Sequence, residues 1–142
     1  MNARKGIIAG IAAGVTYIII STILMIPLDS FLKPYENLAL YKPIVLNPTL
    51  TWMITIYVGY IILAIPLGLF YSILHEAIHG RSAAIKGLNA GLGIWYILCI
   101  MNAFWKYMTI AVPNIILITG IFLDLVVLAL AGVVLGIVYE KA

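Results

Sequence analysis

The stretch KGIIAGI at residues 5–11 returns, little changed, as KGLNAGL at residues 86–92. A second pair of motifs closes each half of the chain: LGLFY at residues 67–71 returns as LGIVY at residues 135–139. Apolar sequence fills the distance between the opening and the closing motif in both halves. Recurrence at a fixed spacing predicts an internal repeat, which determines the fold and is therefore sought first.

Two homologous units follow from this recurrence. We expect a first repeat at about residues 5–74, a second repeat at about residues 86–142, and a linker at about residues 75–85. All of them belong to a single membrane domain that covers residues 1–142. Two-helix units joined in tandem share one orientation, so the halves are predicted to be parallel repeats related by an axis along the membrane normal.

The composition indicates a membrane protein. Of the 142 residues, 65% are hydrophobic and 9% are charged, whereas a soluble domain carries roughly 25% charged residues. A hydrocarbon core of about 30 Å requires about 20 apolar residues in each helix. Four runs are long enough, and none alternates apolar with polar residues as barrel strands do: about 6–26, 50–74, 83–108 and 114–139. The predicted fold class is all-α, a polytopic membrane protein with four transmembrane helices as a tandem parallel repeat of two helical hairpins.

The basic residues predict the topology. Five of the eight lie at one end of the predicted helices, namely Arg4, Lys5, Arg81, Lys86 and Lys141. Because cytoplasmic segments are enriched in Lys and Arg, we expect a multi-pass protein of the cell (inner or plasma) membrane with both termini in the cytoplasm. The net charge of +3 reports this topology, and we expect no nucleic-acid partner.

The segment at residues 27–48 is predicted to be the outer loop of the first repeat. It contains Pro27, Pro34, Pro43 and Pro48, and proline inside a helix removes a backbone hydrogen bond and crowds the preceding turn. We therefore expect the first helix to end before Pro27. Residues 35–42 are expected to form two turns on the membrane surface.

Small residues recur at four-residue steps, which keep them on one face of a helix. In lipid such residues let helix backbones approach closely. Aligning the closing motifs makes Gly68 equivalent to Gly136 and Ala64 equivalent to Gly132. We expect close packing within the chain, with a seam between copies as the alternative, at Gly6, Gly10, Gly14, Ala64, Gly68, Gly87, Gly91, Gly132 and Gly136.

The stretch HEAIH at residues 75–79 matches the zinc-hydrolase pattern H-E-x-x-H. On a helix, His75 and His79 share one face and can bind a zinc ion, with Glu76 as general base. Glu140 aligns near the same surface and is the candidate third ligand. The alternative is a polar linker between the repeats, in which water solvates the His and Glu side chains at the membrane surface.

Asp124 falls about midway along the fourth predicted helix. A charge at that depth is costly, so it indicates a functional site with a partner nearby. The candidate partners are Asn102 and Lys106, one turn apart on the third helix. Tyr57 and Tyr60 on the second helix and Thr16 or Tyr17 on the first are also within reach. Two roles are open: a structural clasp between helices, or a relay for protons or cations.

Three further residues of the third helix have expected roles. The amide of Asn89, which replaces Ile8 of the first repeat, is expected to make a hydrogen bond between helices. Trp95 and Tyr96 lie too deep for the interfacial aromatic belt, and we expect them to fill space within the bundle.

The whole chain resembles an uncharacterised family of small prokaryotic four-helix integral membrane proteins. The resemblance is carried by the Lys-Gly-x-x-Ala-Gly opening of one helix, as at Lys5 and Lys86, and by the Leu-Gly-x-x-Tyr close of a later one. It implies a four-helix membrane architecture and neither an activity nor catalytic residues.

These patterns favour a non-enzymatic integral membrane protein, either an accessory or assembly subunit of a membrane complex or a homo-oligomer. One alternative is a small proton- or cation-linked transporter or channel that uses Asp124. Another is an inner-surface metal site or metallohydrolase that uses His75, Glu76 and His79. No cofactor is expected except zinc in that last case. The expected partners are the lipid bilayer and either further copies of the chain or other membrane subunits.

Overall fold

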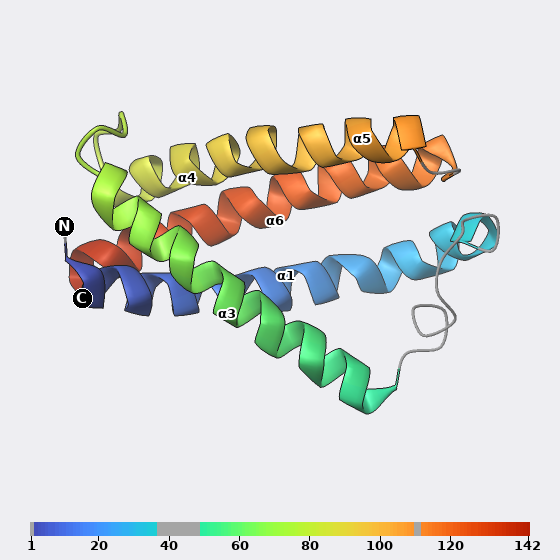
Figure 1. The fold of residues 1–142 in the computed structure, drawn as a ribbon, viewed down its shortest axis with the longest axis horizontal. Coiled ribbons are helices and arrows are strands. Elements are labelled where there is room, and N and C mark those ends of the chain that lie inside the picture. The colour runs from blue at the N-terminus through green and yellow to red at the C-terminus, as the bar shows by residue number, and fades with distance from the viewer. Residues whose placement is uncertain (1, 37–48, 110–111) are drawn as a thin grey trace.

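The computed structural model describes residues 2–36, 49–109 and 112–142, and it is built from helices (Figure 1). The described part of the chain contains no strand, which confirms the all-α class. The elements in chain order are α1 (Ala3–Glu36), α3 (Leu50–Leu74), α4 (Ala83–Ile94), the π-helical segment η1 (Trp95–Ile100), α5 (Met101–Thr109) and α6 (Asn114–Lys141).

Within the described residues, four spans are long and apolar enough to cross a membrane: α1, α3, the continuous run α4–η1–α5, and α6. This confirms the four predicted transmembrane helices, and the chain is a multi-pass integral membrane protein. The sequence placed the second span correctly at residues 50–74. Thr49 begins that helix, since its side chain accepts a hydrogen bond of 3.2 Å from the backbone N–H of Trp52.

The first and last helices form the centre of the bundle (Figure 1). Helix α1 packs against both α3 and α6, and α4 packs against the other side of α6. Both termini lie at the same end of the molecule, which we call the terminal end; the opposite end is the loop end. The hairpins α1–α3 and α4–α6 each run from the terminal end to the loop end and back.

The expected end of the first helix before Pro27 was wrong. Helix α1 continues through Pro27 and Pro34 to Glu36. Prolines are tolerated in transmembrane helices because neighbouring groups satisfy the carbonyl that each one frees. Packing also supports the extension, since Leu32 is only 5% exposed. Of the expected surface turns at residues 35–42, the part from residue 37 onward lies outside the described residues.

The core lies towards the terminal end. Ala9, Tyr71, Leu135 and Tyr139 form a cluster of buried side chains there. All nine of the small residues singled out in the sequence are buried as well. A Cβ atom added to Gly10 would lie 2.6 Å from the carbonyl oxygen of Ala64, and one added to Gly6 would lie 2.8 Å from that of Gly68. Backbone therefore meets backbone where α1 crosses α3.

The second hairpin has a similar contact, displaced by one helical turn from the sequence alignment. Gly68 faces the Gly6 carbonyl oxygen and the Cα of Gly10. Gly132 holds the same place against the Gly87 carbonyl oxygen and the Cα of Gly91. The spatial counterpart of Gly68 is thus Gly132, and not Gly136 as the closing motifs had aligned it.

Candidate functional site: an intramembrane polar pocket at Asp124

Asp124 joins helices from both hairpins. It lies ten residues after the start of α6, a depth of about 15 Å along the helix axis. The hydroxyl of Tyr17 in α1 donates a hydrogen bond of 3.4 Å to its Oδ1 atom. The thiol of Cys99 in η1 lines the same pocket as this carboxyl group. The carboxyl group therefore ties α1 to α6 through Tyr17, which is the geometry of a clasp between the hairpins.

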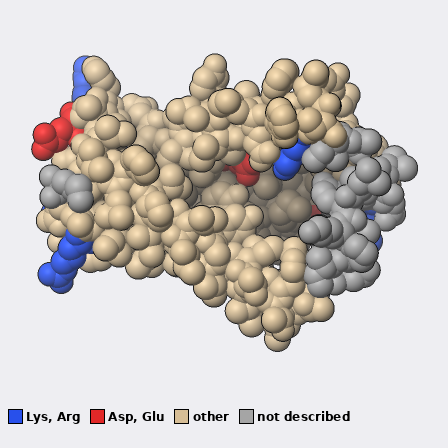
Figure 2. Space-filling view, viewed as in Figure 1, with Lys and Arg blue, Asp and Glu red and all other residues tan. Residues whose placement is uncertain are grey.

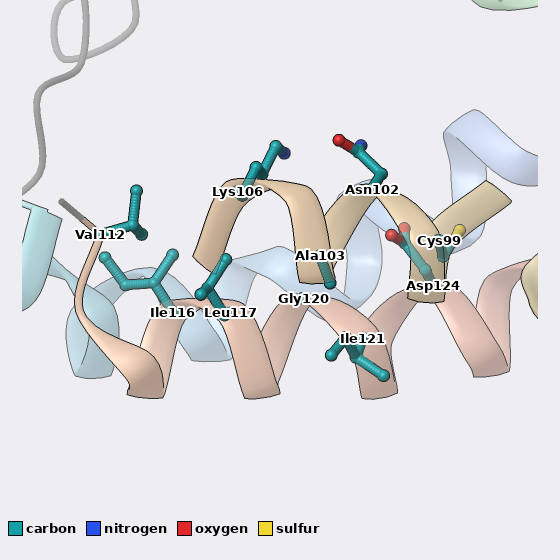
Figure 3. A pocket seen from close by; sticks show the side chains of 10 residues that line it. All are labelled: Cys99, Asn102, Ala103, Lys106, Val112, Ile116, Leu117, Gly120, Ile121 and Asp124. Atoms are coloured by element: carbon teal, nitrogen blue, oxygen red, sulfur yellow. The ribbon is translucent and has the colours of Figure 1, made fainter. Parts of the chain in front are cut away.

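Asp124 also borders a pocket of about 310 Å³ between α5 and α6 (Figure 3). Asn102 and Lys106 line the same pocket, so the structure brings together the three residues predicted for the intramembrane polar site. Both are exposed in the single chain. Figure 2 shows acidic and basic side chains beside a hollow in one face of the molecule. The remaining lining is largely apolar and includes Ile116, Leu117 and Ile121.

Tyr17 and Tyr60 lie outside the pocket that Asp124 lines. Their ring centroids are 5.0 Å apart, and both rings line a second pocket of about 200 Å³ between the two hairpins. Cys99 lines both pockets. The polar pocket beside Asp124 and this more apolar pocket therefore share one lining residue, Cys99.

Cys99 was missed as a residue of the Asp124 pocket. Its spacing was the available signal, because it precedes Asn102 by three residues and shares a helix face with it. A lone cysteine in an apolar run otherwise looks like a small hydrophobic residue. The π-helical geometry of residues Trp95–Ile100 was not expected either, and such segments are frequent at functional sites.

The two aromatic residues at the start of η1 have different surroundings. The indole N–H of Trp95 donates a hydrogen bond of 2.9 Å to the carbonyl oxygen of Ile121, so it packs within the bundle against α6. Tyr96 is 67% exposed. Its expected role of filling space inside the bundle was wrong, because it points away from the other helices of the chain.

The HEAIH stretch is not helical. Helix α3 ends at Leu74, with His75 as its C-cap, so His75 and His79 do not share a helix face. Two side chains of α4 hold this linker. The Lys86 ammonium donates to the His75 carbonyl at 3.0 Å, and the Asn89 amide donates to the His79 carbonyl at 2.6 Å. The expected helix-to-helix bond of Asn89 is thus a helix-to-linker bond.

The three predicted zinc ligands are only partly brought together. His75 and Glu140 line one pocket at the terminal end, and neither His79 nor Glu76 is part of its lining. Within residues 2–36, 49–109 and 112–142, no three His, Cys, Asp or Glu side chains are placed to hold a metal ion. The zinc site stays a prediction without support from the geometry.

The chain matches no protein-family model, no curated protein and no solved structure. The resemblance to small prokaryotic four-helix membrane proteins therefore stays a prediction. The functional proposals below depend on the residues of this chain alone.

Proposed function

We propose that this protein is a non-enzymatic, self-assembling membrane subunit whose copies associate over the Asp124 pocket. The observation that carries the proposal is Asn102. It is exposed and lies seven residues, about 10 Å, from the end of α5. Polar side chains at such depth face protein or water rather than lipid. A neighbouring chain would cover it.

The residues around Asn102 favour a helix as the part of the neighbouring chain that covers it. Met101 and Trp105 are 67% and 66% exposed, respectively, and lipid can cover such apolar side chains. Gly120 lines the pocket one turn before Asp124, and no atom beyond its own turn of helix lies within 4 Å of where its Cβ would be. Small residues of this kind let an incoming helix approach closely. In contrast, the nine small residues named above are already buried within the chain.

The chemistry of the pocket favours a second copy over an unrelated chain. Its polar lining carries a carboxylate at Asp124, an ammonium at Lys106 and an amide at Asn102. Across a two-fold axis the same patch meets itself. An amide both donates and accepts, so Asn102 can bond its own copy, and Lys106 of each chain can approach Asp124 of the other.

The mass of the purified assembly in mild detergent tests this proposal. We expect wild type to run as a multimer, and Asn102→Leu and Gly120→Leu to shift it to the monomer. Asn114→Leu is the matched control, because Asn114 is exposed at the start of α6 and does not line this pocket. A monomeric wild type, or equal masses for all four proteins, would refute self-assembly. If a different protein copurifies in stoichiometric amount, the result would favour a role as an accessory subunit over self-assembly.

A second candidate function is a proton or cation carrier, favoured by a carboxylate at membrane depth that lines a polar pocket together with Lys106 and Asn102. In liposomes, a pH-driven or cation flux should occur with wild type and disappear with Asp124→Asn. Asp29→Asn, an exposed carboxylate in α1, should leave the flux unchanged. Undiminished flux through Asp124→Asn would exclude this role.

A further inference from the structure

A separate pocket of about 440 Å³ opens at the terminal end of the bundle. Three cationic side chains from three parts of the chain line it: Lys5 of α1, Arg81 of the linker and Lys86 of α4. Glu140 is the one carboxylate in the lining, and it is exposed. Positive charge therefore exceeds negative charge around this cavity.

The side chains, and not the helix dipoles, give this end its positive charge. Helices α1 and α4 begin here and α3 and α6 end here, so their partial charges oppose one another. Ser82, which also lines the pocket, caps α4 by accepting a hydrogen bond of 3.3 Å from Ile85. The Lys86 ammonium is fixed by its bond to the His75 carbonyl and has two further N–H groups for a ligand.

The inner wall of the pocket is aromatic and has one unsatisfied polar atom. The His75 ring lies 4.9 Å from that of Tyr139, which meets Tyr71 edge-on at 5.3 Å. The Nδ1 atom of His75 is buried and has no hydrogen-bond partner among the described residues. Buried polar atoms are ordinarily bonded, and His75 is also one of the residues that line this pocket.

We propose that this pocket binds a phosphate group, presented by the headgroup of an anionic phospholipid in the adjoining leaflet. Lys and Arg are the side chains that bind phosphate oxygens, and basic pockets between transmembrane helices take phospholipid headgroups. The volume exceeds that of a bare phosphate and falls in the range of ligand sites. The proposal is independent of self-assembly, because no residue of this pocket lines the Asp124 pocket.

Native mass spectrometry of the full chain with phosphatidylglycerol or phosphatidylcholine tests the proposal. Wild type should retain the anionic lipid preferentially. We expect each basic residue that lines the pocket to contribute about fivefold to affinity, the scale of one basic residue on an anionic headgroup, so Lys5→Gln combined with Arg81→Gln should weaken retention roughly 25-fold. Lys141→Gln, at the same end but outside the lining, is the matched control. His75→Phe keeps the ring packing, removes Nδ1 and should also weaken retention.

Inorganic phosphate distinguishes the two sources of the phosphate group. If millimolar phosphate does not change the retention of phosphatidylglycerol, the pocket binds the lipid. Protection of wild type against thermal unfolding by inorganic phosphate, without preferential lipid retention, assigns it to a free phosphate compound. Equal retention of both lipids with no effect of phosphate, or an equal loss in Lys141→Gln, would overturn the proposal. Unchanged melting of the variants in detergent shows that they remain folded.

Discussion

Gly91 and Gly93 lie two residues apart on α4 in opposite surroundings. A Cβ on Gly91 would meet the carbonyl oxygen of Leu128, whereas one on Gly93 would have nothing within 4 Å. Gly91→Ala should lower the free energy of unfolding by about 1 to 3 kcal/mol through overpacking. Gly93→Ala should leave it unchanged or raise it by up to about 1 kcal/mol, because alanine favours helix. Unfolding in graded detergent mixtures measures both, and equal effects would contradict the close contact.

The clasp at Asp124 predicts a specific order of losses in the free energy of unfolding among variants. Hydrogen bonds between membrane helices contribute about 0.6 kcal/mol on average, so Tyr17→Phe should cost roughly that much free energy of unfolding. Asp124→Asn should cost little, since an amide oxygen still accepts from Tyr17. Asp124→Leu should cost at least as much as Tyr17→Phe, because the same hydrogen bond is lost. The control is Tyr60→Phe, which keeps the ring beside Tyr17; a loss as large as that of Tyr17→Phe would count against the clasp.

Side-chain chemistry at this scale was partly visible in the sequence. Asp124 stood out because a carboxylate within an apolar run is costly. The short hairpin pointed to Asn102 and Lys106, whereas Tyr17 was one of four further candidates on the first two helices. Tertiary packing decided the rest. Cys99 shares a pocket with Asp124 because η1 packs against α6. Tyr96 faces outward, which no local pattern revealed.

Among the elements, the linker after α3 depends on α4 for its shape. Asn89→Ala removes the bond to the His79 carbonyl, and losing a hydrogen bond of about 1 kcal/mol raises the open population roughly fivefold. Trypsin should therefore cut after Arg81, which is exposed in this linker, about five times faster than in wild type. Mass analysis of the fragments measures the rate.

The control for this experiment is Asn114→Ala at the loop end, which should not change cleavage at Arg81. Unchanged cleavage in Asn89→Ala would show that other contacts hold the linker.

Element positions were predicted better than element ends. Apolar run length placed four spans correctly, because the bilayer thickness sets the length of a membrane helix. Pro27 and Pro34 were misread as helix breakers, since the rule from soluble helices ignores packing of the extension at Leu32. HEAIH was open to two interpretations, a helical zinc motif or a polar linker, and α3 ends at Leu74 with His75 as its C-cap, as the linker interpretation requires. The one-turn displacement between Gly68 and Gly136 shows that matching motifs need not occupy matching places.

For the whole molecule, an even number of spans puts both termini on one side of the membrane. Single cysteines introduced at Asn2 and Ala142 in a Cys99→Ala background should react with an impermeant maleimide from the same side. Cysteines at Thr49 and Asn114, at the loop end, should react from the other. With the termini in the cytoplasm, as the basic residues predict, only the loop-end pair labels in intact cells. Opposite accessibility of positions 2 and 142 would refute four spans.

Helices α1 and α6 are neighbours at the centre of the bundle, and the two chain ends lie at the same end of it (Figure 1). Proteins with adjacent termini tolerate circular permutation. A gene that opens the chain within residues 76–82 and joins Ala142 to Asn2 by a short flexible bridge would encode α4–α6 ahead of α1–α3. Since the helix contacts do not depend on which hairpin is synthesised first, the rearranged polypeptide should reach the same bundle.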